Sequence, residues 1–89
     1  MDIDYVVQIW RDGTQFIAHA MPVDVASCGG SPQTARSAVD EAVRLFLKTA
    51  EEHGTLGEVL EDAGYRFDGA RWQSPDWIGI EKHSAPMVV

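Results

Sequence analysis

The chain has 89 residues, of which 45% are hydrophobic and 24% charged, so it predicts one folded domain over residues 1–89 rather than a disordered segment. Fourteen acidic against seven basic residues give a formal net charge of −7, which argues against direct binding of nucleic acid or of an anionic membrane and favours a basic protein partner. The single cysteine excludes an internal disulfide, and neither a signal-peptide pattern nor a membrane-length apolar run is visible, so the cytoplasm is the expected compartment.

Two alternating segments, IDYVVQIW and QFIAHA, flank Asp12-Gly13 and predict a β-hairpin. An Asp-Gly pair favours a two-residue type I′ turn, and this turn sets the register. The apolar core face then consists of three cross-strand pairs: Ile9 with Phe16, Val7 with Ala18 and Tyr5 with Ala20. The opposite, mixed face carries Trp10 with Gln15, Gln8 with Ile17 and Val6 with His19. Such a mixed face suits solvent or a partner.

A short third strand is expected near residues 25–28, followed by a long helix. Ser31 has the chemistry of a helix N-cap, Pro32 suits the first helical position, and Gly54 suits the residue after the helix end. The expected buried stripe recurs at helical spacing and comprises Ala35, Ala38, Val39, Ala42, Leu45, Phe46 and Thr49.

A second, short helix is predicted from Thr55 to Gly64, with Thr55 and Glu58 as a capping box. Its apolar stripe comprises Leu56, Val59, Leu60 and Ala63. The segment YRFDGARW then predicts a small hairpin about Asp68-Gly69, with Tyr65 opposite Trp72.

The segment WIGIEKH, residues 77–83, predicts a last strand with Ile78 and Ile80 on one side, and the apolar end SAPMVV is expected to dock in cis or on a neighbouring subunit. The predicted fold is therefore α+β: an antiparallel sheet of three or four strands on one main helix plus a short second helix, in the order β-β-β-α-α-β. The predicted core comprises Val7, Ile9, Phe16, Ala18, Ala35, Ala42, Leu45, Phe46 and Ile80.

No residue pattern typical of catalysis or of metal binding is present. His19, His53, His83 and Cys28 lack paired ligand spacing, so we expect no metal and no cofactor. Cys28 precedes two glycines and a helix start, where a thiol can be activated, but no base or orienting group is evident, and a buried small hydrophobe is the favoured interpretation. The glycines at 29 and 30 are interpreted as a tight strand-to-helix connection rather than a phosphate cradle, and Asp2, Asp4 and Asp24 as surface residues. The chain is therefore not expected to be an enzyme.

Two features point to an interaction instead. The outer sheet face is partly apolar at Val6, Trp10 and Ile17, which is typical of a binding surface unless the last strand or the tail covers it. An acidic set near the helical junction comprises Glu51, Glu52, Glu58, Glu61 and Asp62, either a solvated face or a partner surface. The candidate partner-binding residues are Val6, Gln8, Trp10, Ile17, His19, Glu58 and Glu61.

The segments YVVQIWRDGTQFIAHAMP and GGSPQTARSAVDEAVRLFL resemble the HicB-type antitoxin family. Positions that match the family pattern are Pro22, Gly29, Ser31, Ala35 and Ala42, and GTLGEVLEDAGY resembles the extension of short stand-alone members. The resemblance covers residues 5–65. It departs from the family at VDVASCGG, and the chain has no room for the family's C-terminal DNA-binding domain.

The resemblance implies a partial RNase H-like fold without nuclease activity, which binds a small basic mRNA-cleaving toxin, HicA, and blocks it by steric occlusion. A homodimer or higher homo-oligomer is expected, because a core this small gains from burial against a second subunit. Three other functions remain open: a small-molecule or regulatory ligand-binding domain using the crevice between helix and sheet, an orphan oligomerisation module, and an enzyme with Cys28 as nucleophile.

Overall fold

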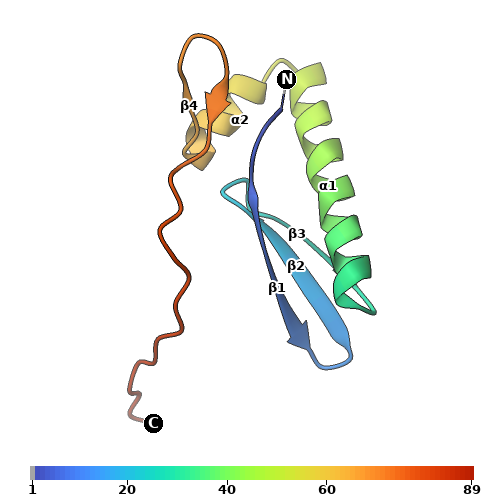
Figure 1. The fold of residues 1–89 in the computed structure, drawn as a ribbon, viewed down its shortest axis with the longest axis vertical. Helices are drawn as coiled ribbons and strands as arrows, with labels where there is room; N and C mark the ends of the chain where they lie inside the picture. Colours follow the sequence, from blue (N-terminus) through green and yellow to red (C-terminus); the bar gives the residue numbers. More distant parts are fainter. Residues whose placement is uncertain (1) are drawn as a thin grey trace.

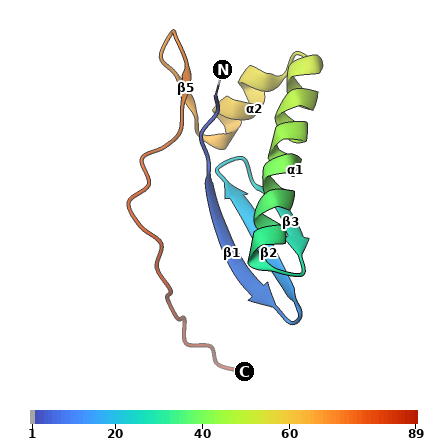
Figure 2. The ribbon, with the colours of Figure 1, turned by 45° about the vertical axis from the view of Figure 1, so that its right-hand side comes forward.

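The computed structural model describes residues 2–89, in which a three-stranded antiparallel sheet carries a long helix across one face (Figures 1 and 2). This arrangement confirms the predicted α+β class. The elements in chain order are β1 (Val6–Asp12), β2 (Gln15–Met21), β3 (Val25–Gly29), α1 (Pro32–Glu52), α2 (Leu56–Ala63), β4 (Arg66–Phe67) and β5 (Trp72–Gln73). The sheet has the order β1-β2-β3, whereas β4 and β5 form a separate two-stranded ribbon beside α2.

The β1–β2 hairpin forms, but its register differs by two residues from the predicted one. Ile9 pairs with Ala18, because the turn consists of Gly13-Thr14 rather than Asp12-Gly13. Of these turn residues only Gly13 has a positive φ, 64°, which meets the type II′ requirement for glycine at the first central position. Side chains alternate with a period of two, so a shift of two keeps each one on its predicted face. The predicted pairs are therefore wrong, while the composition of both faces is as predicted.

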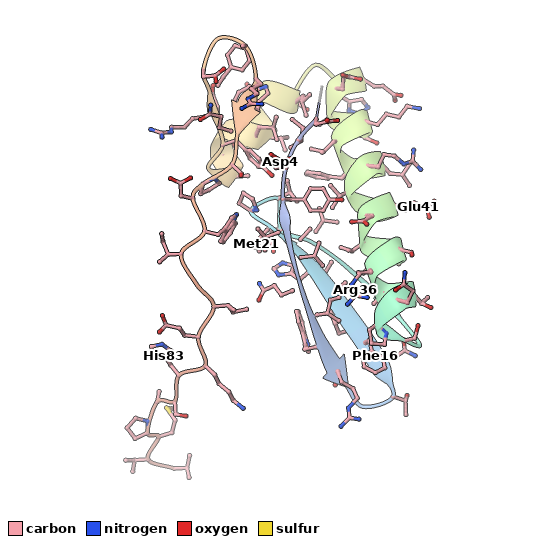
Figure 3. The ribbon with its side chains drawn as sticks, viewed as in Figure 1. Asp4, Phe16, Met21, Arg36, Glu41 and His83 are labelled. Carbon is pink, nitrogen blue, oxygen red and sulfur yellow. The ribbon has the colours of Figure 1, made fainter. Side chains whose placement is uncertain are left out.

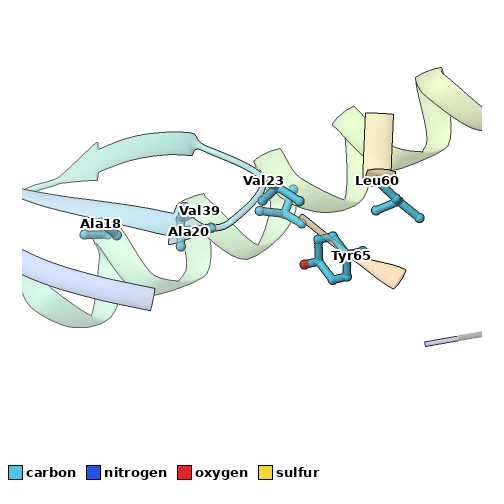
Figure 4. Packing of buried hydrophobic residues seen from close by; sticks show 8 residues of the cluster. Ala18, Ala20, Val23, Val39, Leu60 and Tyr65 are labelled. Carbon is cyan, nitrogen blue, oxygen red and sulfur yellow. The ribbon is translucent and has the colours of Figure 1, made fainter. Parts of the chain in front are cut away.

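The core lies between this sheet and α1. Ala18 and Ala20 are fully buried, and their small side chains let the helix approach the sheet closely. The core cluster, seen from close by in Figure 4, comprises Ala18, Ala20, Val23, Ala35, Val39, Val43, Leu60 and Tyr65. The predicted core residues Val7, Ile9 and Phe16 are partly buried and pack against it.

The ends of α1 follow local sequence signals. The Ser31 hydroxyl accepts a hydrogen bond from the Thr34 backbone N–H at 3.1 Å, and Pro32 occupies the first turn, both as predicted. Gly54 follows the C-cap with φ 72°, the left-handed conformation that commonly terminates a helix at glycine.

The buried side of α1 differs from the predicted stripe. Leu45 is 49% exposed and Phe46 39% exposed, and Ala42 is half-buried, whereas Val43, which the predicted stripe omits, is fully buried. Both choices have helical spacing, so periodicity alone does not separate them. The apolar arc of α1 is wider than the three-stranded sheet, which covers only the side that carries Val39 and Val43.

The second helix confirms its predicted position but not its predicted cap. Leu60 is fully buried, and Gly64 ends α2 with φ 105°. Thr55 is the N-cap, yet its side chain makes no capping bond to α2; its hydroxyl donates to the Ala50 carbonyl of α1 at 3.3 Å instead. The predicted capping box with Glu58 is therefore wrong, because Thr55 joins the two helices rather than closing the second.

The β4–β5 hairpin forms with a longer loop than predicted. Phe67 pairs with Trp72, and their rings lie 5.1 Å apart, so the predicted pairing of Tyr65 with Trp72 is wrong. The Asp68 carboxylate accepts hydrogen bonds from the backbone N–H groups of Ala70 and Arg71, which stabilises a four-residue loop. These two hydrogen bonds, of which the one from Arg71 has the larger effect, lower the pKa of the Asp68 carboxyl.

Two tyrosines attach the residues before β1 to the rest of the domain. The Tyr5 hydroxyl donates to Asp40 of α1 at 2.7 Å, and the hydroxyl of the buried Tyr65 donates to the Asp4 carbonyl. Burial, with the Asp40 carboxylate as a second cause, raises the pKa of Tyr5 to about 12. Burial also raises the pKa of Tyr65.

Residues 74–89, which we call the C-terminal arm, form no helix or strand and extend away from the ribbon (Figures 1 and 2). The strand predicted over residues 77–83 is therefore wrong for this chain on its own: Ile78 is 96% exposed, and Ile80, which was predicted in the core, is 79% exposed. An alternating segment forms a strand only when a neighbouring strand accepts its hydrogen bonds. Docking of the apolar end in cis is not observed, since Met87 and Val88 are also exposed.

Candidate functional site

The outer face of the sheet, opposite α1, brings the predicted sheet residues together. Gln8 lies directly opposite His19, and Trp10 directly opposite Ile17. Val6 pairs with Met21, which is not among the predicted site residues. These residues form one surface because they share the same phase of the β1–β2 alternation.

The side chains drawn in Figure 3 show that Phe16 and Met21 lie on opposite faces of the sheet. Phe16, on the inner face, packs against the core and lies toward the first turns of α1, whereas Met21 lies toward the arm. On the outer face Trp10 is 47% exposed, and the arm flanks only the Val6 end. The alternative expectation, that the last strand or tail covers this face, is therefore wrong for the single chain.

His19 has the best-defined polar environment on this face. Its Nε2 lies 2.6 Å from Asp24 Oδ1, and its ring meets the ring of Trp10 edge to face at 6.3 Å. Asp24 reaches this position from the β2–β3 turn with φ 61°, a left-handed conformation that Asp tolerates better than most residues. The result is an imidazole held beside an exposed tryptophan, and tryptophan is among the residues enriched at the energetic centres of protein interfaces.

Cys28 lies on the same outer face, opposite Ile17, and is exposed, so its predicted burial is wrong. The reason is the strand phase: Gly29, next along β3, lies on the inner side, where a Cβ would come within 2.8 Å of the Ala35 backbone nitrogen. This close approach supports the interpretation of the glycine turn as a tight connection. A nucleophilic cysteine needs a base within hydrogen-bonding reach. The imidazole of His19 hydrogen-bonds to Asp24 and not to Cys28.

The acidic residues of the predicted site lie elsewhere. Glu58 and Glu61 are exposed on α2, beyond the end of the sheet at which β1 begins (Figure 1). The residues of the predicted site therefore lie on two separate surfaces. The exposed acidic set around α2 and the last turn of α1 comprises Glu51, Glu52, Glu58, Glu61 and Asp62.

A third surface, whose α1 residues were predicted to lie in the core, runs between α1 and α2. Leu45, Phe46 and Val59 line an open groove of about 560 Å³, which we call the helical groove. An adjoining hollow of about 580 Å³ is lined by Phe46 and Val59 together with Asp24 and Asp62. An apolar centre with acidic residues at its edge is thus exposed at the helical junction, and sequence periodicity could not reveal it because its exposure depends on how far the sheet extends.

Comparison of the chain with models of known protein families, with curated proteins and with solved structures finds no match. Within residues 2–89, no helix has the length and apolarity needed to cross a membrane. The same residues contain no group of three or more His, Cys, Asp or Glu that could hold a metal ion.

Proposed function

We propose that this chain is a HicB-like antitoxin-type binding protein, which neutralises a small basic mRNA-cleaving toxin of the HicA type by steric occlusion. The observation that carries the proposal is the helical groove with its acidic edge, on a chain of net charge −7. The proposed role needs no catalytic residue, no cofactor and no direct contact with nucleic acid.

The groove has the composition of a protein-binding surface. Interfaces combine an apolar centre with a polar rim, and aromatic side chains near the centre contribute most of the binding energy. Phe46 and Leu45 provide the apolar centre, and both are available without unfolding because they are already exposed. Asp62 lies beside this centre, where a Lys or Arg of a bound partner would be paired.

The overall charge favours a basic partner kinetically. An acidic surface raises the association rate of a basic protein by roughly 10- to 1,000-fold at low salt, and the effect declines as salt screens it. An mRNA-cleaving toxin must itself carry basic residues to bind phosphates. The same residues would be attracted to the acidic junction, so that the bound antitoxin would cover the RNA-binding surface.

The test begins with the genes that adjoin the gene for this chain, where we expect a short, lysine-rich reading frame whose product is the toxin. We expect co-expression of the full chain to restore growth of cells that express this product, and the two proteins to purify together. Asp62→Lys should slow association several-fold at low salt, with the difference shrinking at high salt. Asp12→Lys is the matched control, because it makes the same charge change at the exposed hairpin tip, far from α2.

Phe46→Ala should weaken the complex without unfolding the domain, since the side chain lies at the surface. Equal effects of Asp62→Lys and Asp12→Lys would exclude the helical groove as the docking site. Failure of the unmodified chain to bind the lysine-rich product or to restore growth would exclude the toxin proposal altogether.

We also propose that the chain forms a homodimer or higher homo-oligomer. The observation that favours this is the amount of exposed apolar surface, on the arm and on the outer sheet face, in a domain with a small core. Sedimentation of the purified full chain over a range of concentrations tests it, and a monomer at every concentration would contradict it.

A further inference from the structure

β1 has one edge without a strand partner. It lies at the end of the β1-β2-β3 order, so its N–H and C=O groups on the far side are not paired within the three-stranded sheet. An open edge of this kind is a template for another extended segment. The arm runs beside this edge in the same direction as β1 (Figures 1 and 2).

Between the edge and the arm lies a groove of about 410 Å³, so the two segments face each other without pairing. Val6, Val7 and Gln8 line it from β1 and Met21 from β2, and the arm contributes Trp77, Ile78, Gly79 and Ile80. Ile78 and Ile80 alternate as in a strand, yet both are exposed. An extended apolar segment without a partner gains neither burial nor backbone hydrogen bonds, so the arm needs a second surface to stabilise it.

The arm is longer than the β1 edge of its own chain, so that edge alone does not supply the second surface that the arm needs. Residues 74–89 span about 50 Å when extended, whereas the seven residues of β1 span about 23 Å, at roughly 3.3 Å per residue. Both views show the arm passing beyond the tip of the β1–β2 hairpin (Figures 1 and 2). Its last apolar residues, Met87, Val88 and Val89, are exposed, so the body of their own chain leaves them uncovered.

Charge distinguishes this surface from the helical groove. Residues 74–89 contain two acidic residues and one basic residue, and β1 contains one of each, so both are close to neutral in a chain of net charge −7. The β1 edge and the arm therefore offer little electrostatic attraction to a basic protein. Two copies of the chain would not repel each other strongly at this contact, although each carries a net charge of −7.

We infer that the open edge of β1 binds the C-terminal arm of a second copy of this chain, in a reciprocal exchange that adds residues 77–82 as a fourth strand. Main-chain hydrogen bonds would hold the added strand, and its alternate side chains would cover the Val6 end of the outer face. Because each copy supplies one arm and one edge, the contact is made twice and closes as a twofold dimer. This inference specifies the contact for the homo-oligomer proposed above and is independent of toxin binding.

The experiment is a pairwise disulfide trap in the full chain, with Cys28→Ser as background. One preparation carries Gln8→Cys and another Gly79→Cys; both positions line the groove, and an added Cβ at Gly79 meets no atom within 4 Å. The two preparations are mixed, unfolded together, refolded and oxidised. Peptides joined by a disulfide are then identified by mass spectrometry. Ala26→Cys replaces Gln8→Cys in the matched control, because it lies on the same rung of the sheet but on β3, two strands away.

We expect a covalent dimer joined between positions 8 and 79, at a yield at least several-fold above that of the Ala26→Cys control. A chain that carries both Gln8→Cys and Gly79→Cys should also give linked dimers. If that double variant instead gives only an internal disulfide, and the mixture gives no link, the arm pairs with its own edge and the inference is wrong. If sedimentation shows a dimer but no disulfide forms between positions 8 and 79, the chain is a homo-oligomer whose contact is not the arm, and the inference is wrong.

Discussion

Replacing Leu60 by alanine should destabilise the domain far more than the same replacement at Leu45. Leu60 is fully buried on α2 in the core cluster, whereas Leu45 is 49% exposed on α1. Both residues lie in helices, so the difference in helix propensity between Leu and Ala cancels in the comparison. The pair therefore isolates burial, and it separates the observed core from the one that helical periodicity predicts.

The magnitudes follow from the carbons removed. Leu→Ala deletes three carbon groups, worth about 2.4 kcal/mol at about 0.8 kcal/mol each, and the cavity left in a core raises the cost to about 2–5 kcal/mol. At Leu45 about half of the surface is already in water and no closed cavity forms, so we expect a loss of about 1 kcal/mol or less. A domain of this size has a total unfolding free energy of about 4–13 kcal/mol, so Leu60→Ala removes a large share of it.

Urea unfolding followed by tryptophan fluorescence measures both variants. With a slope of about 1 kcal/mol per molar urea, the midpoint of Leu60→Ala should fall by about 2 M or more, and that of Leu45→Ala by at most about 1 M. Each variant is measured at several protein concentrations, because a residue buried in an oligomer changes stability in a concentration-dependent way. Equal losses at the lowest concentration would refute the assignment of Leu60 to the core and Leu45 to the surface.

Three further predictions concern single contacts. Tyr65→Phe removes the hydrogen bond to the Asp4 carbonyl and should cost about 1 kcal/mol in urea unfolding; no loss would mean that water replaces the bond fully. The raised pKa of Tyr5 means that the folded state favours the neutral phenol, so stability should be complete below pH 10 and fall as the pH rises toward about 12. Tyr5→Phe should flatten that decline, and an unchanged pH profile would contradict the linkage. Gly29→Ala forces a Cβ to within 2.7 Å of Thr34 and should cost about 1–3 kcal/mol, whereas Gly30→Ala, with nothing within 4 Å, should be neutral or slightly stabilising; equal midpoints would contradict the close packing.

The outer-face half of the candidate site could be predicted from the sequence, and the rest could not. Alternation places Gln8 and Trp10 on one face of β1, and His19 stays on that face because the observed register differs from the predicted one by an even number of residues. This is why the predicted group forms although its predicted pairs are wrong. The contact of Asp24 with His19 depends on the path of the β2–β3 turn. The helical groove depends on how α2 docks against α1, and neither of these is encoded in a local pattern.

The sequence by itself determined the elements whose signals are local: the strand alternation, the Ser31-Pro32 start of α1 and the glycines that end both helices. These depend on backbone chemistry within a few residues, so they do not change with the fold around them. Only the tertiary structure decided which arc of α1 is buried, because that depends on the width of the sheet. It also decided that the alternating segment after Trp77 lacks a strand partner in its own chain, since a strand needs hydrogen bonds that residues far away, or in another molecule, must supply.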